Sequence, residues 1–199
     1  MRSFLHAVKL VAGGAGLVAA LLGAVVAPAS ADSSVVKIGS ATPSAGVAVD
    51  TKPDISASAG PVVCLRGHVQ DIGWQNWDCD NDGSRAFAGT LGRGLRLEAL
   101  QVVAYNTGGQ MCVQAHVQDE GWRGRVCVND SDIAQVGTTG LNRRIEALIF
   151  GSTSRTTCTK GHVQDRGWTD NLCVNAGEAR LLGTTGQGLR LEALDATII

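Results

Sequence analysis

The sequence predicts an all-β fold with pseudo-threefold symmetry, built from three repeats of about 46 residues that each contain about four short strands. Three observations support this prediction. One segment recurs three times, its residues alternate between apolar and polar, and turn-forming residues separate the alternating stretches. A single copy of this kind is too small to bury its own apolar face, so the copies must pack on one another.

Internal repetition is the strongest of these signals. Copy one spans residues 64–100, copy two 112–148 and copy three 158–194. The copies are each 37 residues long, align without a gap and share 16 identical positions. The shared positions include two cysteines, His-Val-Gln-Asp, Gly-Trp and Arg-x-Glu-Ala-Leu. Length varies only in the connectors, 101–111 and 149–157, so each copy is one structural unit.

The strands of a copy are predicted from its turns and its alternation. Asp71-Ile72-Gly73 suits a three-residue hairpin loop whose glycine takes a positive φ. A returning strand is expected from Trp74 to about Cys79, and a final strand from Leu95 to about Val103. In that final strand the alternation predicts one apolar face and one charged face. The apolar face would carry Leu95, Leu97 and Ala99, and the charged face Arg96 and Glu98.

Three such copies can close around an axis and leave no sheet edge free. A β-trefoil and a β-prism both meet this requirement, and the sequence does not decide between them. An open solenoid is disfavoured because three repeats without polar caps would expose both ends.

The segments before the repeats predict export. Arg2 and Lys9 precede an apolar run from Leu10 to Ala27 that ends in Ala29-Ser30-Ala31. This pattern is typical of a secretory signal peptide, so we expect residues 1–31 to be cleaved and no membrane anchor to remain. An uncleaved anchor is the alternative. Residues 32–61 are rich in Ser, Ala and Pro and are expected to form a flexible leader to a single domain, 62–199. An edge strand within residues 33–38 is the alternative there.

Charge and cysteine content reduce the number of possible functional classes. Without Arg2 and Lys9 the chain has 15 basic and 18 acidic residues, a formal net charge of −3. Nucleic-acid binders usually carry a basic patch, so we expect no nucleic-acid partner. Six cysteines in an exported chain predict a disulfide framework.

The cysteines stand 15 residues apart within each copy, so a hairpin at 71–73 places the two nearly opposite each other. Two threefold-symmetric pairings exist, one within copies and one between copies, and the hairpin register favours the first. The predicted disulfides within copies are Cys64–Cys79, Cys112–Cys127 and Cys158–Cys173. No C-x-x-C spacing supports zinc instead.

The tryptophans are the main candidate ligand-binding residues. Trp74, Trp122 and Trp168 recur in every copy, and they either anchor the core or offer part of the indole to a sugar ring. Trp77 occurs in copy one alone, which makes it the better candidate for an exposed platform. Hydrogen-bond partners for a ligand are expected from the residues that precede each shared tryptophan: Gln70, Asp71, Gln118, Asp119, Gln164 and Asp165.

The remaining polar residues predict neither a metal site nor an active site. On the axis, His68, His116 and His162 could form a three-histidine zinc site, but we expect each to bond to backbone or to a glutamate. The Arg-x-Glu pairs are expected to form ion pairs or braces between repeats. Every polar candidate occurs three times, and the sequence contains no G-x-S-x-G, no H-E-x-x-H and no P-loop. We therefore expect a protein without enzymatic activity, cofactor or metal.

The motif HVQDIGWQNW, followed by AGTLGRGLRLEAL, resembles the ChW repeat, the "clostridial hydrophobic with conserved Trp" family. Copies two and three resemble it through residues 116–122 with 137–148, and 162–168 with 183–194. The resemblance implies export, display on the bacterial cell surface, and a role in adhesion or polysaccharide binding. We therefore expect a secreted or surface-retained protein that binds a glycan or cell-wall polymer, and a protein-contacting adhesin or structural surface protein is the alternative.

This sequence departs from the family pattern in three ways, one of which is that the second Trp, Trp77, survives only in copy one. The cysteine pairs are not part of the pattern, so the disulfides are an added staple. In copy two, Asn142-Arg143 replaces the Gly-Leu of the other copies, which predicts a locally open copy or a strand that starts one residue later.

Overall fold

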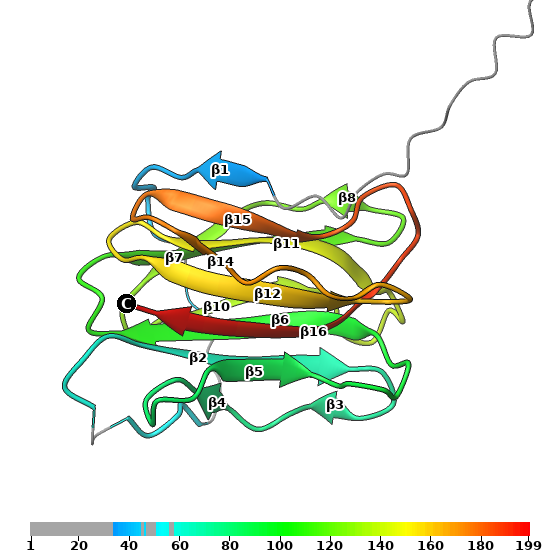
Figure 1. Cartoon of the computed structure of the whole chain (residues 1–199), viewed down its shortest axis with the longest axis horizontal. Coiled ribbons are helices and arrows are strands. Elements are labelled where there is room, and N and C mark those ends of the chain that lie inside the picture. Colours follow the sequence, from blue (N-terminus) through cyan, green and yellow to red (C-terminus); the bar gives the residue numbers. More distant parts are fainter. Residues whose placement is uncertain (1–33, 45, 47–50, 56–57) are drawn as a thin grey trace, which may run out of the picture.

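The computed structural model describes residues 34–44, 46, 51–55 and 58–199. These residues form sixteen β-strands in three antiparallel sheets and no helix, so the predicted all-β class is confirmed (Figure 1). Nothing in the described part of the chain is a helix long and apolar enough to cross a membrane. The predicted signal peptide, residues 1–31, lies outside the described residues.

Each sheet has a central pair of long strands with shorter strands on both sides. The first sheet has the order β10 (Ile133–Gly137), β6 (Leu97–Tyr105), β2 (Val62–Val69) and β3 (Gly73–Trp74), with β4 (Asp78–Cys79) also on β2. The second has β1 (Val35–Lys37), β15 (Glu178–Gly183), β11 (Ile145–Ser152), β7 (Gln110–Val117) and β8 (Gly121–Trp122), with β9 (Val126–Asn129) also on β7. The third has β13 (Gly167–Trp168), β12 (Thr157–Val163), β16 (Leu191–Ile198) and β5 (Ala86–Gly89), with β14 (Leu172–Val174) also on β12.

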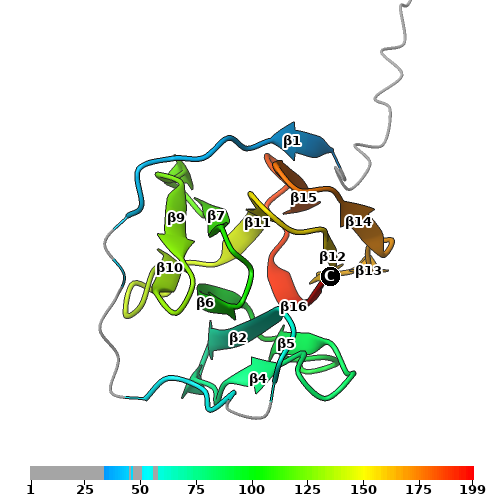
Figure 2. The same ribbon diagram turned by 90° about the vertical axis from the view of Figure 1, so that its left-hand side faces the viewer.

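Every copy contributes one strand to the sheet of another copy. β10 of copy two pairs with β6 of copy one, and β15 of copy three pairs with β11 of copy two. The ring closes where β5 of copy one pairs with β16 of copy three. The three sheets surround a common axis (Figure 2), which is the predicted pseudo-threefold arrangement. They remain separate, and no barrel closes among the described strands.

The inner faces of the sheets form one apolar core, but the predicted alternation of the last strand is wrong at one position. Leu97 and Leu100 enter the core, whereas Ala99 does not. A β-bulge lies opposite His68 and Val69, where the ladder passes from Ala99 to Leu97 and omits Glu98. The extra residue shifts the alternation by one, and both other copies have the same bulge.

The returning strand of each hairpin is also shorter than predicted. In copy one it is divided into β3 and β4, and the break lies at residues 75–77. There the backbone N–H of Gln75 still donates to the carbonyl of Gly67, at 2.8 Å. The Gln75 side chain turns to the fourth strand of its own copy, where it bonds to Gly89. In copy one the break therefore links the hairpin to the strand that the copy lends.

The predicted disulfides are confirmed. Each joins two cysteines that are direct partners across the hairpin: Cys64–Cys79, Cys112–Cys127 and Cys158–Cys173. This register follows from the hairpin turn, where Gly73 takes the predicted positive φ of 80° and Asp71 also has a positive φ of 60°.

Part of the segment expected to be a flexible leader is paired with the domain. Val35–Lys37 forms the edge strand β1 on β15, the alternative that the sequence left open. Further along, Ala41 exchanges two hydrogen bonds with the Gln110 side chain, and Ser44 donates to the carbonyl of Cys127. Figure 2 shows this described part of the leader along the outside of the second sheet. Backbone groups on the open edge of β15 explain why so short a strand can pair.

The unusual Asn142-Arg143 pair of copy two leaves the strand start unchanged. β11 begins at Ile145, the counterpart of Leu97 and Leu191 in the other copies, so the predicted later start is wrong. Asn142 has a φ of 53° and takes the place of a left-handed glycine, a conformation that asparagine tolerates better than most residues. Arg143 turns outward and forms an ion pair with Glu120.

Candidate functional site

Residues that recur in all three copies meet on the outer face of each sheet. A tryptophan, a histidine and the Arg-x-Glu pair of the same copy form what we call an aromatic cluster. Cluster one contains Trp74, His68, Arg96 and Glu98; cluster two contains Trp122, His116, Arg144 and Glu146; cluster three contains Trp168, His162, Arg190 and Glu192.

The geometry of the three clusters is nearly the same. Each histidine ring meets its tryptophan edge to face, with centroids 5.3 Å apart. Its Nδ1 lies 3.0–3.2 Å from one glutamate oxygen, although off the angle of an aligned hydrogen bond. The arginine approaches the other oxygen at 2.7–2.8 Å. One carboxylate thus contacts both the arginine and the histidine, and the histidine packs against the indole.

The bulge explains how this carboxylate reaches two partners. It places Glu98 and its counterparts between the two faces of the strand, and their side chains are only 5–8% exposed. The Arg-x-Glu pairs are therefore ion pairs within each copy rather than braces between copies.

Glu192→Gln should lower the free energy of unfolding by roughly 1–2 kcal/mol, because a buried carboxylate loses its charge-assisted bond to Arg190. Urea denaturation with tryptophan fluorescence measures this change. Glu120→Gln, which removes two exposed ion pairs, with Arg123 and Arg143, is the matched control and should change stability by less than about 1 kcal/mol. Equal losses in both variants would contradict a bridging role for the buried glutamate.

The histidines do not share one site. Each belongs to a different sheet and faces the glutamate of its own copy, which is the arrangement expected from the sequence. Among the described residues no three His, Cys, Asp or Glu side chains are grouped so that they could hold a metal ion.

The shared tryptophans differ in exposure. Trp122 is 39% exposed and Trp168 is 36% exposed, while Trp74 is half-buried. The guanidinium of Arg66 covers Trp74, with its carbon 5.0 Å from the ring centre. In copy two the equivalent residue is Gln114, which instead bonds to the Arg123 carbonyl at 2.7 Å. Copies two and three therefore offer more of the indole than copy one does.

Trp77 is not the exposed platform expected from its uniqueness. Its ring packs on the cluster that contains Ile55, and its Nε1 donates to the carbonyl of Thr51 at 3.0 Å. Arg66 also lies over it, at 5.3 Å. Trp77 is absent from the other copies because its partners belong to the leader, which passes this position once.

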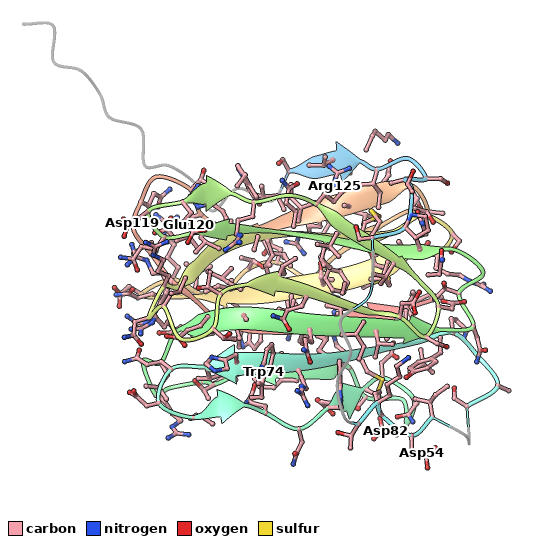
Figure 3. All side chains as sticks on the ribbon, turned by 180° about the vertical axis from the view of Figure 1, so that it is seen from behind. Asp54, Trp74, Asp82, Asp119, Glu120 and Arg125 are labelled. Carbon is pink, nitrogen blue, oxygen red and sulfur yellow. A yellow bond between two sulfur atoms is a disulfide. The ribbon has the colours of Figure 1, made fainter. Side chains whose placement is uncertain are left out.

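The predicted polar partners lie in the hairpin turns beside the tryptophans. Asp71, Asp119 and Asp165 are exposed and have left-handed φ values of 58–63°. The glutamines before them are half-buried, and their backbone N–H groups donate to the arginine carbonyl of the same cluster at 3.0 Å. Figure 3 shows Asp119 and Glu120 at one end of the molecule, with Asp82 and Asp54 at the opposite end. The structure thus brings turns and clusters to the same end.

Residues that the repeat pattern did not single out make the three faces different. Beside cluster three, Lys160, Asp195 and Phe87 are successive partners across β12, β16 and β5. The Lys160 ammonium lies 4.6 Å from the Trp168 ring centre, and Phe87 meets that ring at 6.4 Å. The equivalent rows are Arg66–Gln101–Gln135 in the first sheet and Gln114–Ile149–Leu181 in the second. These positions vary between copies, so only the strand pairing identifies them.

Fold and clusters together define a disulfide-stapled protein of three interlocked β-repeats, each with one tryptophan held on the outer face of a sheet. Residues 68–105 and 162–196 match the family model described as Clostridial hydrophobic W, or ChW. The first and third copies are thus ChW repeats, a family that is found in surface proteins. The second copy, which that model does not match, stays a prediction from its likeness to the other two. No curated protein and no solved structure matches the chain significantly.

Proposed function

We propose that this is a secreted, non-catalytic protein that binds carbohydrate or cell-wall polysaccharide at the bacterial surface through Trp122 and Trp168. The observation that carries this proposal is the exposure of these two indoles, at 39% and 36%, on a rigid support. The exposed part of each indole is apolar surface on which a ligand can pack.

The surroundings of Trp168 support a sugar ligand. A sugar ring needs an apolar surface for its C–H groups and fixed polar groups for its hydroxyls. Trp168 and Phe87 supply the first, and Lys160 with Asp195 supplies the second. Arg85 pairs with the same aspartate and donates to the Cys158 carbonyl at 2.7 Å, which fixes the orientation of the carboxylate.

Export and the absence of catalysis are parts of the same proposal. Three disulfides fit an extracellular protein, and the ChW family is found in surface proteins. The polar groups of the clusters recur in each copy and take part in structural ion pairs, whereas an active site is normally one asymmetric group of residues.

Trp168→Ala should weaken binding to cell-wall polysaccharide by about tenfold or more, because a tryptophan at the centre of a contact commonly contributes over 1 kcal/mol. Trp122→Ala should have a similar effect if both platforms bind. Titration of the oxidised protein with solubilised polysaccharide, followed by intrinsic fluorescence, measures the change.

Trp77→Phe is the matched control, since that indole is covered by the leader and should leave affinity unchanged. A blank result for the parent protein, both on a broad glycan array and in sedimentation with insoluble cell walls, would overturn the proposal.

A protein-contacting adhesin is the second candidate, favoured by exposed apolar side chains at the hairpin end. Ile72, Leu91 and Leu141 are 42%, 46% and 57% exposed in the loops beside the clusters. If these residues form the contact, Leu141→Ser should abolish binding to the partner while glycan binding persists. Pull-down from a bacterial surface extract with parent and variant separates the two functions.

A further inference from the structure

Copy two has a cavity at a position where copy one places a side chain. Each copy has a corner where its hairpin meets the strand that it lends to another sheet. We call this the corner crevice. The residue after the shared tryptophan borders it: Gln75, Arg123 or Thr169. The backbone runs alike in all three, since this residue donates to the β2, β7 or β12 carbonyl opposite at 2.8–2.9 Å.

In copy one the Gln75 carboxamide occupies the crevice. Its Nε2 donates to the carbonyl of Gly89 at 2.8 Å, and the Gly89 N–H donates to its Oε1 at 2.7 Å. Both polar ends of the amide are thus bound by one glycine, and Gly89 is buried.

Gly137 is the counterpart of Gly89, with the same conformation. Its φ is 88° against 109°, and each glycine pairs with an alanine of the neighbouring sheet. The threonine that follows each donates to a glutamate carbonyl across the strand, at 2.8 Å and 3.0 Å. Because successive residues of a strand point their polar groups to opposite sides, the N–H and C=O of Gly137 are directed into the crevice.

Copy two does not fill this space with its own side chain. Arg123 turns to Glu120, with Nη1 3.0 Å from the carboxylate, and a Cβ at Gly124 would meet nothing within 4 Å. A cavity of ≈ 340 Å³ remains, lined by Arg123, Gly124, Val126, Gln135, Val136 and Gly137. Gly137 is accordingly half-exposed, whereas Gly183 of copy three is buried like Gly89.

We propose that the corner crevice of copy two binds a primary carboxamide, with the Gly137 N–H donating to its oxygen and the Gly137 carbonyl accepting from its nitrogen. A primary amide offers an N–H and a C=O on one edge, as Gln75 does in copy one. A secondary acetamido group in its trans form points them in opposite directions. A carboxylate has no donor. The volume admits more than the amide group, so the source is a glutamine or asparagine side chain of a peptide.

The test follows the Gly137 amide resonance of the ¹⁵N-labelled, oxidised protein. Acetamide should shift it saturably, with roughly millimolar affinity for so small a ligand. N-methylacetamide, N-acetylglucosamine and acetate should not. A capped Gly-Gln-Gly peptide with a C-terminal N-methylamide should bind about tenfold more tightly than acetamide, and its Gly-Glu-Gly analogue should not bind.

Arg123→Gln supplies the decisive variant, because it allows copy two to fill its crevice as copy one does. The acetamide response at Gly137 should then disappear while the melting temperature is maintained or raised. Arg123→Lys is the matched control and should keep the response. Equal shifts with acetamide and N-methylacetamide, or an undiminished response in Arg123→Gln, would overturn the proposal. Glycan binding at Trp122 and Trp168 is a separate measurement, so either idea can fail alone.

Discussion

Reduction of the three disulfides is expected to unfold the protein near room temperature. Each closes a hairpin with a sequence separation of 15, a loop that contributes about 3 kcal/mol. Together the three contribute about as much as the whole stability of a typical domain, 5–15 kcal/mol. Circular dichroism during incubation with dithiothreitol should show loss of the β signal, and reoxidation should restore it.

The disulfides should be reduced in a definite order, starting with Cys158–Cys173. Cys173 is exposed, whereas Cys112 and Cys127 are buried. Ile38 of the leader packs against the Cys112–Cys127 pair, and Ile55 against the Cys64–Cys79 pair. Timed alkylation followed by peptide mass spectrometry measures the order. If the copy-two bond is reduced as quickly as that of copy three, the leader does not protect it.

Removing one disulfide at a time measures how much each bond stabilises the fold, independently of how easily it is reduced. Replacing Cys158 and Cys173 together by alanine should lower the melting temperature by about 6–12 °C, from about 3 kcal/mol in a domain of this size. The same change at Cys112 and Cys127 should cost at least as much, since it also removes buried sulfur atoms from a packed cluster. A melting temperature unchanged in both variants would mean that the sheets alone maintain the fold.

The sequence predicts those features of the fold that depend on neighbouring residues, such as turns and hairpin register. The turn at 71–73 sets the hairpin register, and that register alone pairs Cys64 with Cys79. Regular alternation predicts Ala99 on the apolar face because alanine is itself apolar, so the bulge at Glu98 is not predicted. Its consequence is that Leu100 replaces Ala99 in the core. Nor does repetition indicate which sheet receives β5, since that depends on contacts between copies.

In the candidate site, too, the recurring residues could be predicted, and the contacts with residues distant in the sequence could not. Trp74, Trp122 and Trp168 were identified because they recur, and the structure places all three in equivalent clusters. What lies over each ring differs between copies: Arg66 covers Trp74, Lys160 lies over Trp168, and the equivalent Gln114 bonds to a backbone carbonyl instead. Trp77 was misjudged because its partner, Thr51, lies in a segment whose composition predicts little structure.

Gly183→Ala is expected to lower the free energy of unfolding by about 2–6 kcal/mol, a large effect for a substitution that removes no side chain. Gly183 has a φ of 93°, which costs a residue with a Cβ roughly 1–3 kcal/mol. Its Cβ would also lie 2.9 Å from the Cα of Ala147 in the neighbouring copy, and closer still to the Glu146 carbonyl oxygen. Overpacking of this kind adds about 1–3 kcal/mol.

Gly186→Ala in the same copy isolates the first contribution, the backbone cost. Gly186 has a φ of 69°, but a Cβ there would meet nothing within 4 Å, so only the backbone cost of about 1–2 kcal/mol applies. Urea denaturation of both variants measures the difference, and equal losses would mean that β15 can move away from β11 without penalty. Gly89→Ala probes the contact between copy one and copy three, where a Cβ would stand 2.6 Å from the Cα of Ala193. Because this pairing closes the ring, its loss should separate the first copy from the third and lower the cooperativity of unfolding as well as its midpoint.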